Sequence, residues 1–283
     1  MKKLQIIFAI VLSALSINLF AQETDKLTVP LSEPTKEAKV QVSLVFGSIK
    51  VSAYDGKDII IEAKEMVFDK GNRINTNTNG NGNSSNDDTK SMRRLNTNKG
   101  GFEITAKEVN NLVKIGIGNP NQPVTFLIKV PRKCSLKLNT VNNGSIEVEG
   151  VTGNFEISNV NGSITLKNVG GSVSANTING NITVGLTSAS SSPMAFSNIN
   201  GKIDVSFPAH FSANFKLKSD RGDVFSDFDM DLTAGSPNPK VKVDNEKGLY
   251  KLNKDGWSYG KLNKGGAEIM MKTMNGNIYI RKK

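Results

Sequence analysis

Acidic residues that alternate along one short segment are the first candidates for chemistry. Asp227, Asp229 and Asp231 occupy every second position of SDFDMD. On a β-strand their carboxylates would lie on one face about 7 Å apart, where they could hold a hard cation such as Ca²⁺. A 12-residue calcium loop starting at Asp227 would need glycine and glutamate where the chain has Leu232 and Asn238. We therefore interpret the three as a solvated strand face and predict no metal site.

Two other groups resemble known functional residues only in their type. Arg221, Gly222 and Asp223 spell the tripeptide of integrin ligands, but Gly222 falls where the repeat described below expects a turn. His210 lies in the loop segment PAHF, and no nucleophile motif such as G-x-S-x-G accompanies it. We predict a structural turn for the first and no acid–base role for the second.

The single cysteine is best explained by packing. Cys134 alternates with Leu136 and Leu138, which predicts a small core residue. With no second cysteine, it cannot form an internal disulfide.

Outward-facing glutamates are the remaining candidates for catalysis. Glu147, Glu149 and Glu156 project from predicted strands, but later repeats carry Thr165 and Lys167 at equivalent places. A carbohydrate-cleaving β-helix enzyme would need paired carboxylates in one groove. The sequence therefore predicts a protein that is not an enzyme, with no catalytic, cofactor-binding or metal-binding residues.

A nine-residue repeat positions most of these residues. Glycines recur at intervals of nine from residue 144 to residue 180, and each precedes a phrase such as SIEV or SITL. The alternation of apolar and polar residues predicts strands with one buried face and one wet face. The predicted inward pairs are Ile146/Val148, Phe155/Ile157, Ile164/Leu166, Val173/Ala175 and Ile182/Val184.

Asn-Gly pairs at every second repeat add a period of 18 residues. Gly47 opens the pattern and Gly276 closes it. Asparagine tolerates the left-handed turn conformation, and stacked amides can hydrogen-bond to each other, so Asn143, Asn161, Asn179 and Asn200 are predicted to form a ladder. The predicted structural turns are Gly144, Gly153, Gly162, Gly171, Gly180, Gly201, Gly222, Gly276, Asn143, Asn161, Asn179, Asn200 and Asn275.

Two all-β architectures could use this pattern. Asn-Gly favours antiparallel hairpins and hence a meander. An elongated β-solenoid of parallel strands, with half-rungs of about nine residues, 18-residue coils and irregular insertions, would stack like turns on like. The solenoid is favoured because the chain has no amphipathic helix to cover a flat sheet. In a coil, Val151, Val160, Val169 and Ile178 could turn inward at the corners.

The N-terminus predicts export. Residues 1–21 have Lys2 and Lys3 before an apolar stretch and Ala21 at a cleavage position, as in a signal peptide. The alternative is an uncleaved membrane anchor, for which the stretch is short and polar. No later segment reaches transmembrane length.

The rest of the chain is predicted to be one domain preceded by a short linker. Residues 22–37 are predicted to be a linker and residues 38–283 a single solenoid domain. The Asn-rich segment 70–100 breaks every period and is predicted to be a disordered insertion. Residues 232–265 are predicted to leave the solenoid path.

Positive charge accumulates towards the C-terminus. Residues 240–283 contain eleven Lys or Arg against four Asp or Glu, in a chain with a net charge of +10. In an exported protein such charge suits an anionic lipid or glycan surface. The alternative is a solvated lysine-rich surface. The basic residues are scattered without interleaved aromatics, so no nucleic-acid partner is predicted.

The repeat resembles a bacterial family. TINGNITV at 177–184, the segment 200–224 and the ending 263–280 resemble the exported "putative adhesin" proteins of β-strand repeats, a domain of unknown function. The resemblance covers residues 38–283, apart from the insertion at 70–100. It implies a β-solenoid in an envelope setting and no catalytic residues.

Three functions remain open at this stage. The favoured hypothesis is a non-catalytic, exported β-solenoid, periplasmic or on the cell surface, that presents a repetitive surface to a glycan or an envelope protein. The alternative is a periplasmic regulatory or assembly partner, bound through a sheet end or the basic region. A glycan-active β-helix enzyme is the least favoured.

Overall fold

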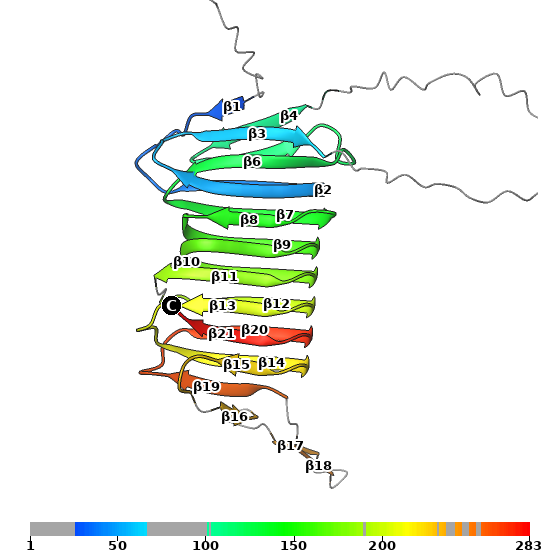
Figure 1. Ribbon diagram of the computed structural model, residues 1–283, viewed down its shortest axis with the longest axis vertical. Coiled ribbons are helices and arrows are strands. Elements are labelled where there is room, and N and C mark those ends of the chain that lie inside the picture. The colour runs from blue at the N-terminus through cyan, green and yellow to red at the C-terminus, as the bar shows by residue number, and fades with distance from the viewer. Residues whose placement is uncertain are drawn as a thin grey trace, which may run out of the picture.

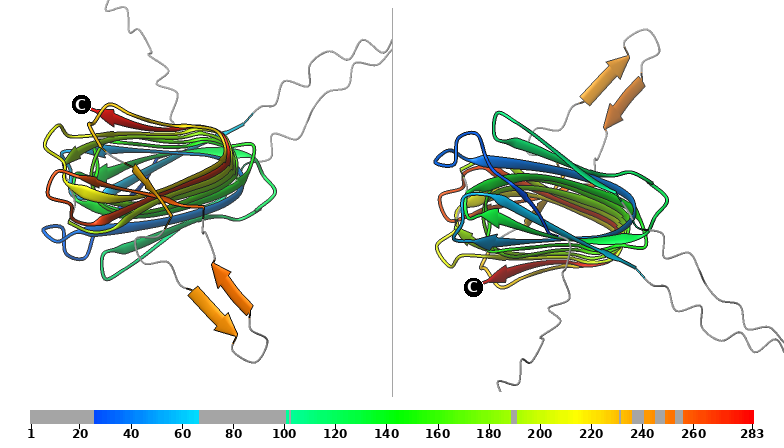
Figure 2. Two further views of the ribbon diagram at one scale, coloured as in Figure 1. Left: turned by 90° about the horizontal axis from the view of Figure 1, so that it is seen from below. Right: turned by 90° about the horizontal axis from the view of Figure 1, so that it is seen from above.

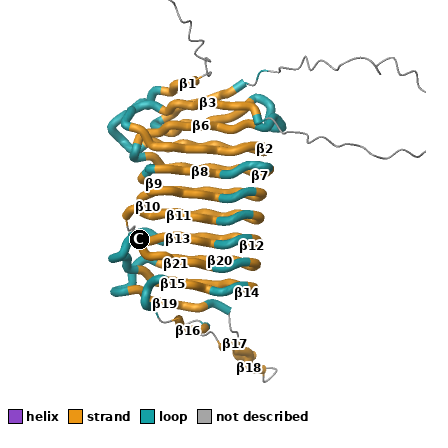
Figure 3. Tube along the Cα trace, viewed as in Figure 1, coloured by secondary structure: helices purple, strands orange, loops and turns teal. Residues whose placement is uncertain are grey.

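The computed structural model describes residues 26–66, 101, 103–188, 191–230, 232–235, 241–244, 249–252 and 256–283. Within them every regular element is a β-strand (Figure 3), so the predicted all-β class is confirmed. The predicted signal peptide at 1–21 and the insertion at 70–100 lie outside the described residues, as does Asp231.

The strands wind around one elongated core as a stack of coils (Figure 1). Each coil runs along one wall, turns a bend and returns along the other wall, so that the strands close around the core when viewed end-on (Figure 2). Pairing between repeats is parallel: Ile164 lies beside both Ile146 and Ile182, eighteen residues away in either direction. The antiparallel pairing of a meander is not what joins the repeats.

One wall is a ladder of mainly parallel strands, called here the first ladder. Along the stack it comprises β3 (Ile59–Glu65), β6 (Val124–Pro131), the second half of β2 (Ala38–Tyr54), β8 (Ile146–Glu149), the start of β10 (Ile164–Asn179), β11 (Ile182–Ser188), β13 (Ile203–Phe207), β21 (Ile278–Lys282) and β15 (Val224–Ser226).

The other wall is the second ladder. It comprises β4 (Ile104–Val109), β5 (Leu112–Ile117), the first half of β2, β7 (Cys134–Asn142), β9 (Thr152–Asn161), the end of β10, β12 (Met194–Asn200), β20 (Glu268–Asn275), β14 (Ala213–Arg221), β19 (Ser258–Leu262) and β16 (Leu232–Ala234). A separate hairpin pairs β17 (Val241–Asp244) with β18 (Leu249–Leu252).

The core fills the narrow space between the ladders. Every predicted inward pair from Ile146/Val148 to Ile182/Val184 is buried, at most 2% exposed. Like residues stack on like, as in the isoleucine column from Ile146 through Ile164 and Ile182 to Ile203 and Ile278. Each such side chain contributes about 1.5–3 kcal/mol through burial.

Two coils lie out of sequence order. The coil of β2 lies between the coil of β5 and β6 and the coil of β7 and β8. The coil of β20 and β21 lies between that of β12 and β13 and that of β14 and β15. The prediction that Gly276 closes the pattern is therefore wrong in space, because the coil of Gly222 follows it, whereas Gly47, which faces Val124 of the preceding coil, remains the first glycine of the pattern.

Antiparallel strands terminate three of the four ladder ends. β1 (Lys26–Val29), inside the predicted linker 22–37, pairs with β3; β4 pairs with β5; and β16 and β19 follow β14. At the fourth end the first ladder stops at β15, whose one strand partner among the described residues is β21. Among the described residues, no antiparallel strand covers this end.

Candidate binding surfaces

Glycine lines the bend at which each coil passes from the second ladder to the first, called here the Asn-Gly bend. A Cβ on Gly162 would collide with the carbonyl oxygen of Gly144, and one on Gly276 with that of Gly201. Successive backbones approach so closely that only glycine fits. The column consists of Gly47, Gly144, Gly162, Gly180, Gly201, Gly276 and Gly222.

A second column of inward-pointing polar side chains satisfies these glycine carbonyls. Thr177 Oγ1 donates to Gly162 O at 3.0 Å, and Asn159 Nδ2 donates to Gly144 O at 2.9 Å. Buried carbonyls need such partners. The column consists of Thr140, Asn159, Thr177, Asn198, Thr273 and Ser219. Sequence reasoning missed it, although a polar residue three or four positions before each glycine from Gly144 onwards was the visible sign; before Gly47 the equivalent residue is Leu44.

The asparagines that precede the glycines form a chain of amide hydrogen bonds along the outside of the bend. Asn179 Nδ2 donates to Asn161 Oδ1 at 2.9 Å, Asn200 Nδ2 to Asn179 Oδ1 at 2.7 Å, and Asn275 Nδ2 to Asn200 Oδ1 at 2.7 Å. Each coil is thereby tied to the next by side chains as well as by backbone.

One predicted member of this ladder is wrong. Asn161 Nδ2 donates at 3.2 Å to Asn142, not to Asn143. The segment TVNNG has one residue more than TING, and Asn143 takes up the extra residue with a left-handed φ of 54°. The ladder position therefore moves back by one.

The opposite bend, from the first ladder back to the second, is built differently. Gly153 and Gly171 lie within β9 and β10 there, and a Cβ on Gly171 would collide with the carbonyl of Gly153. Val151 and Val169 are fully buried at this bend, as predicted.

At the Asn-Gly bend, the residues that correspond to Val151 and Val169 point away from the core. Val160 is half-buried and Ile178 is 42% exposed, so the prediction that both turn inward is wrong. Their neighbours Asn159 and Thr177 occupy the inward position because the glycine carbonyls need donors.

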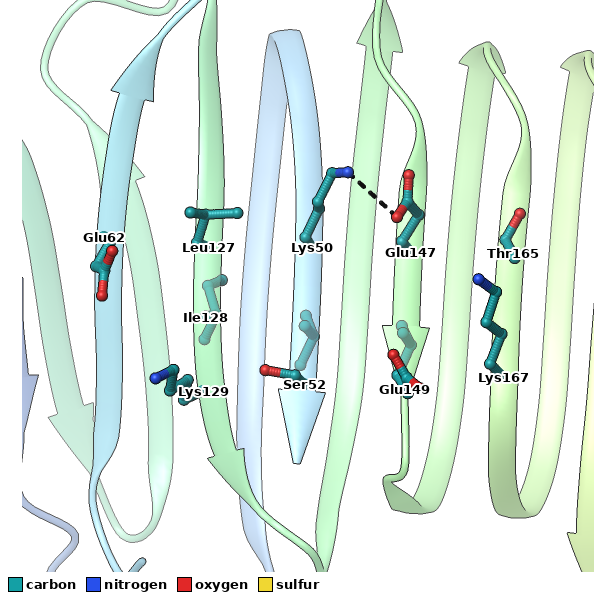
Figure 4. Close-up of a pocket in the computed structure, with 12 residues that line it drawn as sticks. Lys50, Ser52, Glu62, Leu127, Ile128, Lys129, Glu147, Glu149, Thr165 and Lys167 are labelled. Carbon is teal, nitrogen blue, oxygen red and sulfur yellow. Dashed lines mark ion pairs between the residues drawn. The ribbon is translucent and has the colours of Figure 1, made fainter. Parts of the chain in front are cut away.

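A shallow groove of about 390 Å³ lies on the outer face of the first ladder (Figure 4). Lys50 and Glu147 form an ion pair at 3.3 Å across it, and Glu149 lies beside Lys167 in register. Opposite charges thus face each other in this groove, and at such exposure each pair contributes little stability. Glu147 and Glu149 project outward as predicted, as does Glu156, which pairs with Lys137 at 2.7 Å on the other wall.

A charged and aromatic cluster occupies the far end of the same ladder. Arg281 Nε donates to Asp204 Oδ1 at 2.7 Å, and Lys202 Nζ lies 3.3 Å from Asp204 Oδ2. Burial of Asp204 disfavours its charged form, but the hydrogen bonds from Arg281 and Lys202 outweigh this and hold the pKa of Asp204 below its ordinary value. Tyr279 stacks on the exposed Phe225 with ring centroids 5.2 Å apart.

Lysines gather on the outer face of the second ladder, on β14, β19 and β20, strands that lie near the lower end of the stack in Figure 1. Lys272 and Lys218 are cross-strand neighbours, and Lys216 Nζ lies 4.8 Å from the centre of the Trp257 ring. Lys261 lies on the next strand, opposite Asn214. We call Lys216, Lys218, Lys261 and Lys272, with Trp257, the basic patch.

Little acidic charge balances the basic patch. Lys218 is 3.5 Å from Asp220, whereas Lys261 and Lys272 have no carboxylate within ion-pair distance in the described part of the chain. Sequence reasoning singled out the lysines after residue 240 but missed Lys216 and Lys218, which strand pairing brings to them from β14.

The remaining predicted positions carry no assembled site. Asp227 and Asp229 are exposed and lie in a bend, so the strand face predicted for them is absent. Gly222 of Arg221-Gly222-Asp223 lies at a bend, and a Cβ on it would collide with the Gly276 carbonyl.

The other two candidate side chains lie apart from these surfaces. His210 is exposed at a turn. Cys134 is fully buried, and burial, with a smaller contribution from Glu37, raises its pKa to about 12.

Two kinds of feature are absent from the described residues. These residues contain no group of three or more His, Cys, Asp or Glu residues arranged to hold a metal ion. They also contain no helix long and apolar enough to cross a membrane.

Comparison with known proteins gives only distant similarity. No family model matches the sequence, and no curated protein matches it. A "putative cell adhesion protein" from Clostridium sporogenes is 13% identical, with a TM-score of 0.38 over 91% of this chain and 99% of its own. A "putative adhesin" from Bacteroides fragilis is 12% identical, with a TM-score of 0.41 over 90% of this chain and 95% of its own. Similarity this distant assigns neither a ligand nor an activity.

Proposed function

We propose that this chain is a non-catalytic, exported β-solenoid of the cell envelope that binds an anionic glycan through the basic patch. The observation that carries the proposal is that lysines from β14, β19 and β20 share the outer face of the second ladder, with Trp257 beside Lys216. An aromatic face beside several ammonium groups suits a ligand with an apolar ring face and acidic substituents.

Charge balance favours the basic patch over the groove of the first ladder. In the groove, lysine is opposed by glutamate, as in the Lys50–Glu147 pair. In the basic patch, Lys261 and Lys272 are exposed and lack carboxylate partners among the described residues. An approaching anion would therefore meet more net positive charge at the patch than in the groove.

The test is a matched pair of charge-reversal variants. Lys216→Glu with Lys261→Glu and Lys272→Glu should weaken binding to immobilised lipopolysaccharide or another acidic polysaccharide by at least about tenfold. The control, Lys50→Glu with Lys129→Glu and Lys167→Glu, removes the same positive charge from the first ladder and should keep most of the binding. The measurement is a titration by surface binding at low and physiological salt.

Three outcomes would contradict the proposal. The first is that the chain binds no acidic polysaccharide, and the second is that both triple variants lose binding equally. The third is that the purified chain cleaves the polysaccharide. Equal loss would mean that net charge alone drives the contact.

A regulatory or assembly partner is the second candidate, and it has its own supporting observation. The first ladder ends at the short strand β15, whose middle residue, Phe225, is 48% exposed. A partner could add a strand there. Stoichiometric co-purification of one envelope protein, lost on Phe225→Asp, would favour this function. Protection of the chain from protease until the envelope is opened would favour a periplasmic setting for it.

A further inference from the structure

A line of exposed aliphatic side chains follows the outside of the Asn-Gly bends. It contains five residues that are 38–47% exposed, at corresponding positions of different coils, and the half-buried Val160 between them. In order along the stack they are Val45, Val141, Val160, Ile178, Ile199 and Met274. Since neighbouring strands lie about 4.8 Å apart, the line is about 24 Å long.

Uncharged polar residues flank this line on both sides. On one side are Ser43, Asn139, Ser158, Asn176 and Ser197, and on the other are Asn142, Asn161, Asn179, Asn200 and Asn275. We call the aliphatic line and these two columns the neutral strip. Charge begins at its edges: Lys272 follows Ser197 in the first column on β20, and the paired Lys137 and Glu156 lie two residues along β7 and β9 from it.

A surface without charge is unusual in this chain, of which 22% is charged residues. Depletion of charge together with exposed aliphatic groups marks the centre of protein–protein interfaces. For a molecule with a net charge of +10, a neutral strip is also where two copies could meet with least repulsion.

The flanking polar groups are already partnered along the stack. Ser158 Oγ donates to Asn176 Oδ1 at 2.9 Å, and Asn179 Nδ2 donates to Asn161 Oδ1 at 2.9 Å. Covering the strip would therefore remove aliphatic surface from water while these hydrogen bonds remain in place. At the β2 end the second column continues from Asn142 to the half-buried Phe46, which adds one aromatic ring beside Val45.

We propose that the neutral strip is a self-association surface, on which a second copy of this chain packs in antiparallel orientation. Both copies carry side chains at the same spacing, so the aliphatic groups of one can pack against those of the other along the whole strip, as in packed β-sheet interfaces. The antiparallel arrangement has two-fold symmetry and closes at two copies.

The size of the strip determines how tightly the two copies are expected to bind each other. Three columns over about 24 Å bury less than the roughly 800 Å² per partner of a standard interface. The dimer is therefore reversible and forms in the micromolar range or above. Lys272 of the basic patch lies beside the strip on β20, whereas Lys216 and Lys261 lie on β14 and β19 beyond it, so variants of these two test ligand binding separately from association.

The first experiment measures mass against concentration by sedimentation or light scattering, from low to several hundred micromolar. The wild type should pass from monomer to dimer, and Ile178→Lys with Ile199→Lys should weaken the dimer by at least about tenfold. Thr165→Lys with Thr183→Lys adds the same charge to the first ladder and should leave the dimer unchanged. All four side chains lie on outer faces, and unchanged melting curves would verify that the variants fold.

Cross-linking tests the orientation. Ile178 lies near the middle of the strip, so a two-fold axis there brings Ile178 of each copy together, and Ile178→Cys should give a disulfide-linked dimer on mild oxidation. Thr183→Cys on the first ladder is the control and should not. The natural Cys134 is fully buried and stays out of the reaction.

The proposal is wrong if the wild type remains monomeric throughout the concentration range, or if both lysine pairs weaken the dimer equally. A monomer that instead binds a neutral polysaccharide, and loses it on Ile178→Lys with Ile199→Lys, would assign the strip to glycan. If the basic-patch variants do not affect binding of acidic polysaccharide, the proposed glycan function is wrong, but the measurement of dimer formation still decides the self-association proposal.

Discussion

At the Asn-Gly bend, polar side chains turn inward and aliphatic side chains turn outward, whereas at the opposite bend aliphatic side chains turn inward. Thr177 is buried and Ile178 exposed at the first, and Val169 is fully buried at the second. Both bends must reverse the chain within a few residues around the same narrow core. The difference lies in what the core side of each bend must satisfy.

The backbone explains the contrast. At the Asn-Gly bend the column of glycine carbonyls points at the core and needs donors, which hydroxyl and amide side chains supply. At the opposite bend a left-handed residue, Gly150 with φ 73° or Asn168 with φ 53°, shifts the alternation so that Val151 or Val169 points inward. A repeat of nine therefore places equivalent residues in opposite environments at alternate bends.

The largest effect is expected from breaking the close approach at the Asn-Gly bend. Gly162→Val places a side chain against the carbonyl of Gly144, where the backbone of the adjacent coil must move. We expect a loss of several kcal/mol, at least about 3, in the free energy of unfolding, measured in urea.

Gly185→Ala is the control for that change. A Cβ on Gly185 meets no atom closer than 3.5 Å, so its effect should stay within about 0.5 kcal/mol. Equal destabilisation by the two variants would show that glycine is needed for some reason other than close approach.

Exchanging side-chain types between the bends should have an intermediate effect. Thr177→Val leaves the Gly162 carbonyl without its donor, and Val169→Thr places a hydroxyl in an apolar position. Each should cost about 1–3 kcal/mol, measured by urea unfolding, although each introduces the residue type that the other bend accepts. If either exchange is neutral, the two bends are not specialised as described.

The smallest effect is expected from the outer amides. Asn161→Ala with Asn179→Ala breaks the ladder at the Asn-Gly bend but leaves the buried column intact. The melting temperature should fall by a few degrees, corresponding to about 1 kcal/mol for exposed hydrogen bonds. Ser172→Ala with Asn154→Ala removes one exposed hydrogen bond away from this bend and should lower it less. An unchanged melting curve for the asparagine pair would contradict a structural role for the ladder.

Local alternation was enough to predict the all-β class and the inward side chains of the repeats. Ile164 and Leu166 could be placed because neighbours two apart on a strand share a face, which depends only on local backbone geometry. The positions at which the alternation shifts could not be placed in this way. Val160 and Ile178 were assigned inward because their period matches that of Val151 and Val169, and the period carries no information on which bend they occupy.

The candidate surfaces were predictable only in part. The lysines after residue 240 drew attention to a basic region, but Lys216 and Lys218 reach Lys272 through pairing of β14 with β20, strands about fifty residues apart in the chain. The neutral strip depends on the same kind of long-range register. No local feature shows that Val45 lies beside Val141, because their coils are brought together only by β2 entering the stack between β6 and β8.

By itself, the sequence determined the strands, their buried faces and the 18-residue period, because these follow from alternation along a few residues and from glycine where backbones approach closely. The tertiary structure decided the order of the coils and the opposite orientation of side chains at the two bends. It also decided that Asn142, and not the predicted Asn143, belongs to the ladder. It also assembled the basic patch and the neutral strip. These features depend on hydrogen-bond register between coils far apart in the chain, which cannot be read from the residues of either coil alone.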